Sequence, residues 1–461
     1  MDKRFILIIS AIVLLSSCKV YKQYERPAVN VNSVYRDTIN NAEPLAVNDT
    51  ANFGNIPWKE VFTDPMLQEL IDSGLKNNTD LQTAVLSVDQ AKSMLKSARL
   101  SFLPAFSFNG TGTLSSWDGG EISKTYSLPV EASWTVDLFG SLKNAERSQQ
   151  AVLLQAEDYQ QAIRTSLIAN IANCYYTLLM LDRQLELTES TVKLTKQTWD
   201  MMEIQKKYSG ATEAAVQSGR ANYFSVLASI PELKRQIRET ENSLSLLLGQ
   251  APQSIPRGKL DSESLPSGLN TGIAVQLLSN RPDVHAAEMN LSGCYYATNK
   301  ARAAFYPNIT ISGSAGWTNN AGSAIINPGK ILAAAVGSLS QPIFANGRLK
   351  AALKVAEAQQ QAAYLKWQYA VLNAGSEVSN ALTLYHSSAK KSMLEKEQIE
   401  SLQKNVDVTQ KLFKLGSSTY IEVISAQQSL LGAQLTQISD DFYKMQAVVN
   451  LYYALGGGRE Q

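Results

Sequence analysis

Few residues in this 461-residue chain have the side-chain chemistry that catalysis or metal binding usually needs. There are two histidines, His285 and His386, and three cysteines, of which Cys174 and Cys294 lie far from the N-terminus. The histidines lack neighbours at metal-ligand spacing, and both cysteines fall within helical patterns, where small buried thiols are expected. We therefore predict no metal site and no catalytic residues, so the chain is not expected to be an enzyme.

Nucleotides and nucleic acids are equally unexpected partners. Gly110-Thr111-Gly112 lacks the rest of a dinucleotide-binding loop, and Gly456-Gly457-Gly458 has no following P-loop lysine. The chain carries 42 Lys and Arg residues against 41 Asp and Glu residues. Such a balance lacks the basic excess that phosphate contacts require, so a nucleic-acid binder is excluded as a class.

The remaining cysteine, Cys18, predicts a covalent modification. Lys3 and Arg4 precede an apolar run from Phe5 to Leu15, which is long enough for a secretory signal but short for a membrane-spanning helix. Leu15-Ser16-Ser17 directly before Cys18 resembles a bacterial lipobox. The resemblance implies cleavage before Cys18 and a lipid on its thiol, with no other cofactor. The alternative is an ordinary export signal that ends in cysteine.

Residue 19 and the composition of the mature chain predict how the protein meets a membrane. The lipoprotein rule retains chains with Asp after the modified cysteine in the inner membrane, so Lys19 favours the outer membrane. We assign residues 1–17 to the signal peptide and 18–57 to a lipidated linker. No later apolar run is long enough for a spanning helix, so a membrane-spanning part must be built from β-strands.

The predicted structural elements that position the remaining candidate residues occur twice in the chain. Residues of the first half recur about 203 to 207 positions later, in order and with little drift. The recurring pairs include Asn77 and Asn280, Asp80 and Asp283, Pro104 and Pro307, and Leu248-Gly249 and Leu455-Gly456. We predict two tandem repeats at 58–256 and 266–458, a linker at 257–265 and a tail at 459–461.

Each repeat predicts a helix pair, a β-hairpin and a long helical hairpin, an α+β architecture. In the first helix pair, Leu81, Val85, Val88, Leu95 and Ala98 share one helical face. Apolar and polar residues then alternate over 106–114 and 126–136, and again over 309–317 and 331–341, with 319–329 as the second hairpin loop. Alternating segments of about ten residues have the length of membrane β-strands.

The long helical hairpins are indicated by heptad spacing and by the absence of proline. The first helix is expected over about 141–207, with a seam of Leu167, Ile171, Cys174, Leu178, Leu181, Leu185, Thr188 and Val192. The matching seam near the C-terminus is Leu431, Leu435, Ile438, Phe442, Met445, Val449 and Tyr452. Tight turns are expected at Tyr208-Ser209-Gly210 and at Leu415-Gly416-Ser417. Since four strands cannot close a membrane barrel, other copies of the chain must complete it.

Five segments carry a family resemblance that covers essentially the whole mature chain. They are WKEVFTDPML at 58–67, IPEL at 230–233, NRPDV at 280–284, ARAAFYP at 301–307 and ALGGG at 454–458. The chain resembles the TolC-like outer membrane efflux proteins, in the branch of lipid-anchored outer membrane factors that serve resistance–nodulation–division pumps. The resemblance implies a homotrimer with a twelve-stranded β-barrel, four strands from each chain. A long periplasmic α-helical barrel with an equatorial domain would continue it.

The same resemblance implies partners and sites. The partners are a periplasmic adaptor, an inner-membrane transporter and outer membrane lipid. The adaptor would dock at the two glycine turns, at Ser209, Gly210, Leu415, Gly416 and Ser417. The second turn would lie at the periplasmic tip, where family members often carry acids at positions matching Ser418, Glu422 and Ser425. Only Glu422 is acidic here. It is either a gate carboxylate or an ordinary glutamate near a helix start, and Tyr420 is a candidate steric plug.

The predicted function is therefore a passive exit duct for small molecules in a tripartite efflux pump. A type I protein-secretion duct of the same fold is the nearest alternative. A lipid-anchored coiled-coil scaffold without a pore is the alternative from another class, and the four alternating strands argue against it.

Overall fold

The computed structural model describes residues 21–28, 52–116, 118–208, 211–263, 280–318 and 331–459. Cys18, the signal peptide, Ser209, Gly210 and the predicted loop 319–329 lie outside the described residues. The chain forms two compact units, each assembled from pieces of both sequence repeats. One unit combines the described parts of 1–29, 86–158 and 286–369, and the other combines those of 30–85, 159–285 and 370–461.

The first repeat begins with short helices that precede the long ones. These are the 3₁₀-helix η2 (Phe53–Asn55) and the helices α2 (Trp58–Val61), α3 (Pro65–Asn77) and α4 (Thr79–Leu100). The carboxylate of Asp64 accepts a hydrogen bond from the Met66 backbone N–H, and Pro65 occupies the first helical position, so the start of α3 is capped. The predicted apolar face of α4 is wrong at Val85, which is 41% exposed. Ala84 and Ala91 complete that face instead.

Five further helices include the two long pairs expected from the heptads. They are α5 (Ser141–Tyr208), α6 (Glu213–Leu247), α8 (Pro282–Ala303), α9 (Arg348–Lys414) and α10 (Tyr420–Ala454). In the predicted α5 seam, Leu167, Ile171, Leu178, Leu181 and Thr188 are buried, while Cys174, Leu185 and Val192 are half-buried. The α10 seam is buried from Ile438 onward, but Leu431 and Leu435 are only half-buried. No helix among the described residues combines the length and the apolar character needed to cross a bilayer.

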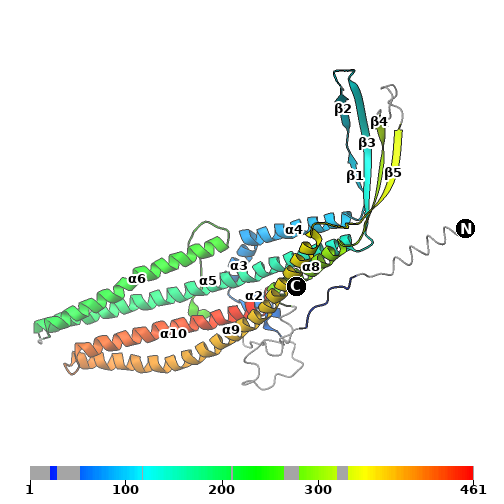
Figure 1. Ribbon diagram of the computed structural model, residues 1–461. Helices are drawn as coiled ribbons and strands as arrows, with labels where there is room; N and C mark the ends of the chain where they lie inside the picture. The colour runs from blue at the N-terminus through cyan, green and yellow to red at the C-terminus, as the bar shows by residue number, and fades with distance from the viewer. Residues whose placement is uncertain are drawn as a thin grey trace. The chain divides into compact units, whose positions relative to one another are not determined.

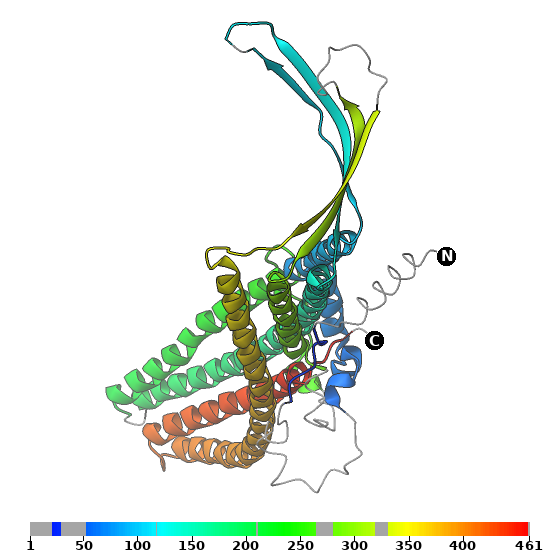
Figure 2. The ribbon, with the colours of Figure 1, turned by 45° about the vertical axis from the view of Figure 1, so that its right-hand side comes forward.

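The turn ends of the two helical hairpins lie together in their unit (Figures 1 and 2). A buried cluster joins Met202 of α5, Val216 of α6, Phe413 of α9 and Val423 of α10. Gly416 has φ +73°, the left-handed conformation that ends α9. The Ser417 N–H donates to the Leu412 carbonyl at 2.9 Å, which closes the turn predicted from the sequence.

Within the described parts of the chain, five strands form one antiparallel sheet (Figure 1). They are β1 (Ala105–Phe108), β2 (Thr111–Ser115), β3 (Ser123–Val136), β4 (Asn308–Thr318) and β5 (Ile331–Ser340). β1 and β2 both pair with β3, β3 pairs with β4, and β4 pairs with β5. The hairpins of the two repeats are thus joined through β3 and β4, and Figure 2 shows the twist of the resulting sheet.

The predicted strand over 106–114 is interrupted, and the cause is Pro129. β1 and β2 pair with β3 in one continuous register, which places Asn109 opposite Pro129. The Asn109 N–H donates to the Pro129 carbonyl at 3.4 Å, but proline has no N–H to return the bond. The break therefore lies at the one position where the ladder loses a donor.

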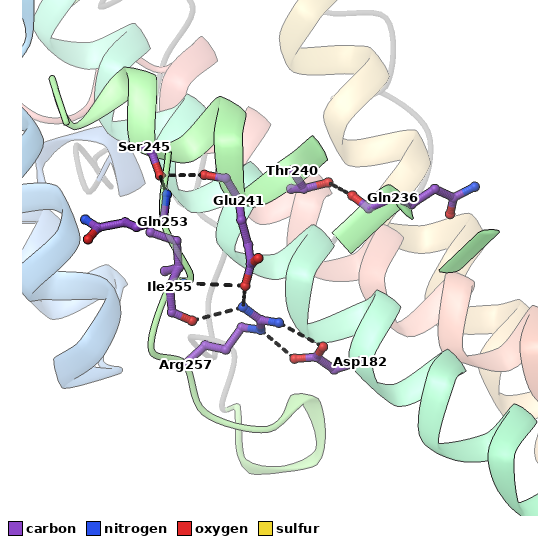
Figure 3. Close-up of polar contacts among 8 residues, drawn as sticks. All are labelled: Asp182, Gln236, Thr240, Glu241, Ser245, Gln253, Ile255 and Arg257. Carbon is purple, nitrogen blue, oxygen red and sulfur yellow. Dashed lines mark hydrogen bonds and ion pairs between the residues drawn. The ribbon is translucent and has the colours of Figure 1, made fainter. Parts of the chain in front are cut away.

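A segment that follows α6 is pinned to two helices by Arg257 (Figure 3). Its guanidinium donates to Asp182 of α5 at 2.5 and 3.0 Å and to Glu241 of α6 at 2.6 Å. The Arg257 side chain is only 14% exposed. The Ile255 N–H also donates to Glu241, so this glutamate holds both the backbone and the arginine of the segment.

Removing the Arg257 guanidinium should weaken the attachment of the segment that follows α6 to α5 and α6. Arg257→Ala leaves Glu241, itself 14% exposed, without its charged donor, and we expect it to lower the free energy of unfolding by roughly 2 kcal/mol. Urea unfolding measures the loss, and limited proteolysis should show faster cleavage within 251–263. Arg235→Ala is the matched control on α6, because its ion pairs with Glu232 and Glu239 are exposed and little change is expected. Equal effects of the two substitutions would contradict the prediction.

A second buried arginine joins the start of α8 to the end of α10. The Arg281 side chain is 2% exposed and forms a two-point ion pair with Asp283, at 2.9 and 2.6 Å. It also donates to Glu377 of α9 at 2.6 Å and to the Ala454 carbonyl at 3.2 Å. Ala454 is the last residue of α10, so Arg281 satisfies a carbonyl that the helix leaves free.

Candidate functional site

The sheet separates apolar from polar side chains onto opposite faces. Residues that are paired across strands share a face, so the register decides the sorting. One face carries Phe106, Phe108, Leu128, Val130, Ala132, Trp134, Ile309, Ile311, Ala315, Trp317, Ala333, Ala335 and Leu339. The other carries mainly Ser107, Asn109, Thr111, Ser127, Glu131, Ser133, Thr135, Thr310, Ser312, Ser314 and Ser338.

The apolar face of this sheet is exposed within the single chain. Phe106 is 74% exposed, Phe108 64% and Trp317 45%. None of the described helices covers these large side chains, although burying them would be worth about 1.5–3 kcal/mol each. An exposed apolar face opposite a hydroxyl-rich face is the pattern of a sheet with lipid on one side and water on the other.

At the turn end of the helices, three of the four gate candidates come together. Ser418, Glu422 and Ser425 line a hollow of about 520 Å³ with Ser417, between α9 and α10. Tyr420 is half-buried and packs instead against the cluster that contains Met202 and Phe413. The structure therefore assigns Tyr420 a packing role, while the steric-plug role that the sequence suggested stays untested.

Glu422 has partners that the sequence analysis did not assign. Its carboxylate accepts hydrogen bonds from the Thr419 N–H, at 2.8 Å, and from the Ser418 hydroxyl, while the Thr419 hydroxyl accepts from the Glu422 N–H. This is a capping box at the start of α10. The Thr-x-x-Glu spacing at 419–422 is the sequence signal for this capping box. The hydroxyl of Ser418 and the N–H of Thr419 lower the pKa of Glu422, so the group stays ionised.

Polar contacts near the turns, two of them between side chains, tie one helical hairpin to the other. The side chain of Gln427 on α10 donates to the Thr198 hydroxyl of α5 at 2.8 Å, and both residues are buried. Gln428 donates to the Asn222 side chain of α6 at 2.8 Å. The heptad pattern did not reveal these residues, because it locates only the apolar seam.

Comparison with known proteins identifies the family. A model of the outer membrane efflux protein family matches residues 70–250 and 273–457. The chain belongs to this family. The two matched segments cover most of the described chain, including all five strands and the long helices.

The relatives of this outer membrane efflux protein include a cation efflux system protein and a probable outer membrane lipoprotein. It is 29% identical over 457 residues to the cation efflux system protein CusC of Escherichia coli O157:H7, covering 97% of each chain. It is 28% identical over 463 residues to a probable outer membrane lipoprotein, SilC of Salmonella typhimurium, covering 99% of each. A solved CusC structure, reported with transmembrane channel formation, matches with a TM-score of 0.85 and 27% identity, over 96% of this chain and 100% of that one.

These comparisons confirm the predicted family, the α+β fold with tandem repeats, and the outer membrane as the location of this efflux protein. The roles of the individual site residues stay predictions. Among the described residues, no group of three or more His, Cys, Asp or Glu side chains is arranged to hold a metal ion.

The cap at Glu422 predicts a pH dependence at the turn of this efflux protein. Because folding lowers the pKa of Glu422, its contribution to stability is present above the unfolded value, near 4.5, and is lost as the pH falls through the lowered value. Hydrogen exchange over 415–424, corrected for intrinsic rates, should therefore accelerate in acid. Glu422→Gln should remove that acceleration. A variant that kept the full pH response would contradict the assignment.

Proposed function

We propose that three copies of this chain form the outer membrane exit duct of a tripartite efflux pump. Each copy contributes its four strand positions to a twelve-stranded β-barrel, and the long helices form a tube on the periplasmic side. The duct conducts small molecules passively, without catalysis, since the energy comes from the inner-membrane transporter. The name of the relative CusC, a cation efflux system protein, favours efflux over the secretion of proteins.

The observation that carries the proposal is the two-faced sheet. Among the described strands, β1 and β2 at one edge and β5 at the other each pair on one side only. Unpaired edges in a bilayer are prohibitively costly, so a sheet with a lipid-facing side must close on itself. Because β1 and β2 share one strand position along β3, a single chain supplies four positions, too few for a barrel, and three copies supply twelve. The Ser- and Thr-rich face then lines the lumen.

The helical turns would form the gated end of the duct. Gln427 with Thr198, and Gln428 with Asn222, hold the two hairpins of a chain together close to the turns. We infer that the duct is narrow while these contacts persist and widens when they break. In the trimer, three Glu422 carboxylates with Ser418 and Ser425 would border the opening. The adaptor would dock at Leu415, Gly416 and Ser417 and at the Ser209-Gly210 turn.

A lipid on Cys18 would anchor the protein in the outer membrane. Arg26, eight residues further on, pairs with the buried Glu288 of α8 at 2.7 and 2.8 Å. The Tyr24 N–H donates to the Tyr296 hydroxyl of the same helix at 3.3 Å. The described residues 21–28, which follow Cys18 closely, are thus held against α8. The description of SilC as a lipoprotein supports the same modification here.

Ionic current through the purified, lipidated protein in a planar bilayer tests the duct. The wild type should give small step-like currents, and Gln427→Ala, which removes a buried contact near the turns, should enlarge or prolong them. Gln428→Ala should act in the same direction. If neither variant conducts, and removal of Thr419, Tyr420 and Ile421 also fails to open a pore, the chain is not a duct.

A further inference from the structure

The strands of the sheet carry a single acidic side chain, Glu131. The described strands contain one other charged residue, Lys124, which lies near the turn end of β3 and shares a face with Leu114. Glu131 lies on the hydroxyl-rich face and is exposed. Its paired neighbours are Ser107 in β1 and Ser314 in β4, whose side chains are short and uncharged. The carboxylate therefore has no cationic neighbour at the paired positions.

The break between β1 and β2 positions this carboxylate. Asn109 lies opposite Pro129, the residue that interrupts the ladder, and its side-chain amide donates to the Glu131 carboxylate at 2.9 Å. This hydrogen bond to an anionic acceptor limits the rotation of the carboxylate. Pro129 thus interrupts the hydrogen-bond ladder, and Asn109, which lies opposite it, orients the Glu131 carboxylate.

We propose that Glu131 is the residue of the sheet that determines ion preference, favouring cations and cationic substrates on the polar face. This inference rests on the proposed duct, in which three such carboxylates lie at one level of the barrel. The carboxylate of Glu422 is engaged in the cap of its own helix, whereas Glu131 lies on the hydroxyl-rich face of the sheet, which lines the lumen in the proposed duct. Asn109 acts as a positioning residue.

Thiol modification tests the charge at this level without requiring the helical end to open. Ser107, directly opposite Glu131, is replaced by cysteine in a Cys174→Ser, Cys294→Ser background that keeps Cys18. The lipidated protein in liposomes is treated with cationic and with anionic methanethiosulfonate reagents. The ratio of the two rates should fall about five- to tenfold in Glu131→Gln at 0.01 M salt, and less than about twofold at 1 M.

Two matched variants sharpen this test. Glu131→Asp keeps the charge and should retain most of the wild-type ratio. Glu121→Gln removes an exposed carboxylate outside the strands and should leave the ratio unchanged. An unchanged ratio in Glu131→Gln would overturn the role of Glu131 while leaving the duct intact. If the Ser107→Cys protein reacts with neither reagent, this face does not line water, and the proposed duct itself would then fail.

Discussion

Ala315→Arg is expected to keep this protein out of the outer membrane. Ala315 lies on the apolar face of β4, paired with Val130 and Ala333. An arginine facing lipid costs about 2–4 kcal/mol near the middle of a bilayer, and three copies in a closed barrel multiply the cost. The measurement is the fraction of the protein recovered in the outer membrane as a heat-resistant oligomer, and we expect it to fall by more than about tenfold.

Ser314→Arg is the matched control for this substitution. Ser314 is the preceding residue of the same strand, similar in size, but it lies on the opposite face and pairs with Glu131. An arginine there meets water and a carboxylate, so insertion should be nearly normal. If both variants inserted equally well, or if Ser314→Arg were the worse of the two, the assignment of the faces would be wrong.

The second large effect is expected at Arg281. Arg281→Ala removes a guanidinium that is 2% exposed, and with it the ion pairs to Asp283 and Glu377 and the hydrogen bond to the Ala454 carbonyl. Loss of one partner from a buried ion pair typically costs about 3–5 kcal/mol, and we expect the lower end because both carboxylates are partly exposed. Chemical unfolding followed by circular dichroism would measure the change.

Arg302→Ala provides the comparison for Arg281. Arg302 pairs with Glu357 at 3.3 Å, and both side chains are about half-exposed, so its loss should cost less than about 1 kcal/mol. Arg281→Lys should fall between the two, because lysine keeps the charge but lacks the planar fork. Similar losses for Arg281→Ala and Arg302→Ala would contradict the central role of Arg281 in joining α8, α9 and α10.

The sequence predicted the periodic parts of this fold closely. Alternating strand residues and heptads repeat along the chain, and such periods can be recognised without knowledge of tertiary contacts. The helix expected over 141–207 ends at Tyr208, and the strands of the second repeat, β4 and β5, agree with the expected segments within a residue or two. The family motifs supplied what periodicity cannot, namely the location and the efflux function.

What the sequence did not reveal depends on contacts between distant residues. Arg257 has no local signal for its pairing with Asp182 and Glu241, which lie on different helices. The interruption of the first strand required knowing that Asn109 faces Pro129, which only the register shows. At Glu422 the local Thr-x-x-Glu pattern of a capping box was present in the sequence. The family resemblance, however, also suggested a gate carboxylate at this position.

The pairing of β3 with β4 sets an order of events in folding. Ser127 pairs with Thr318 and Val136 with Ile309, so the centre of the sheet joins segments separated by the whole of α5, α6 and α8. Such non-local pairings form slowly, because a long loop must close before any ladder bond is gained. Until residue 318 has been exported, the first hairpin has an apolar face and no partner. We therefore expect the nascent chain to need a periplasmic chaperone over that interval.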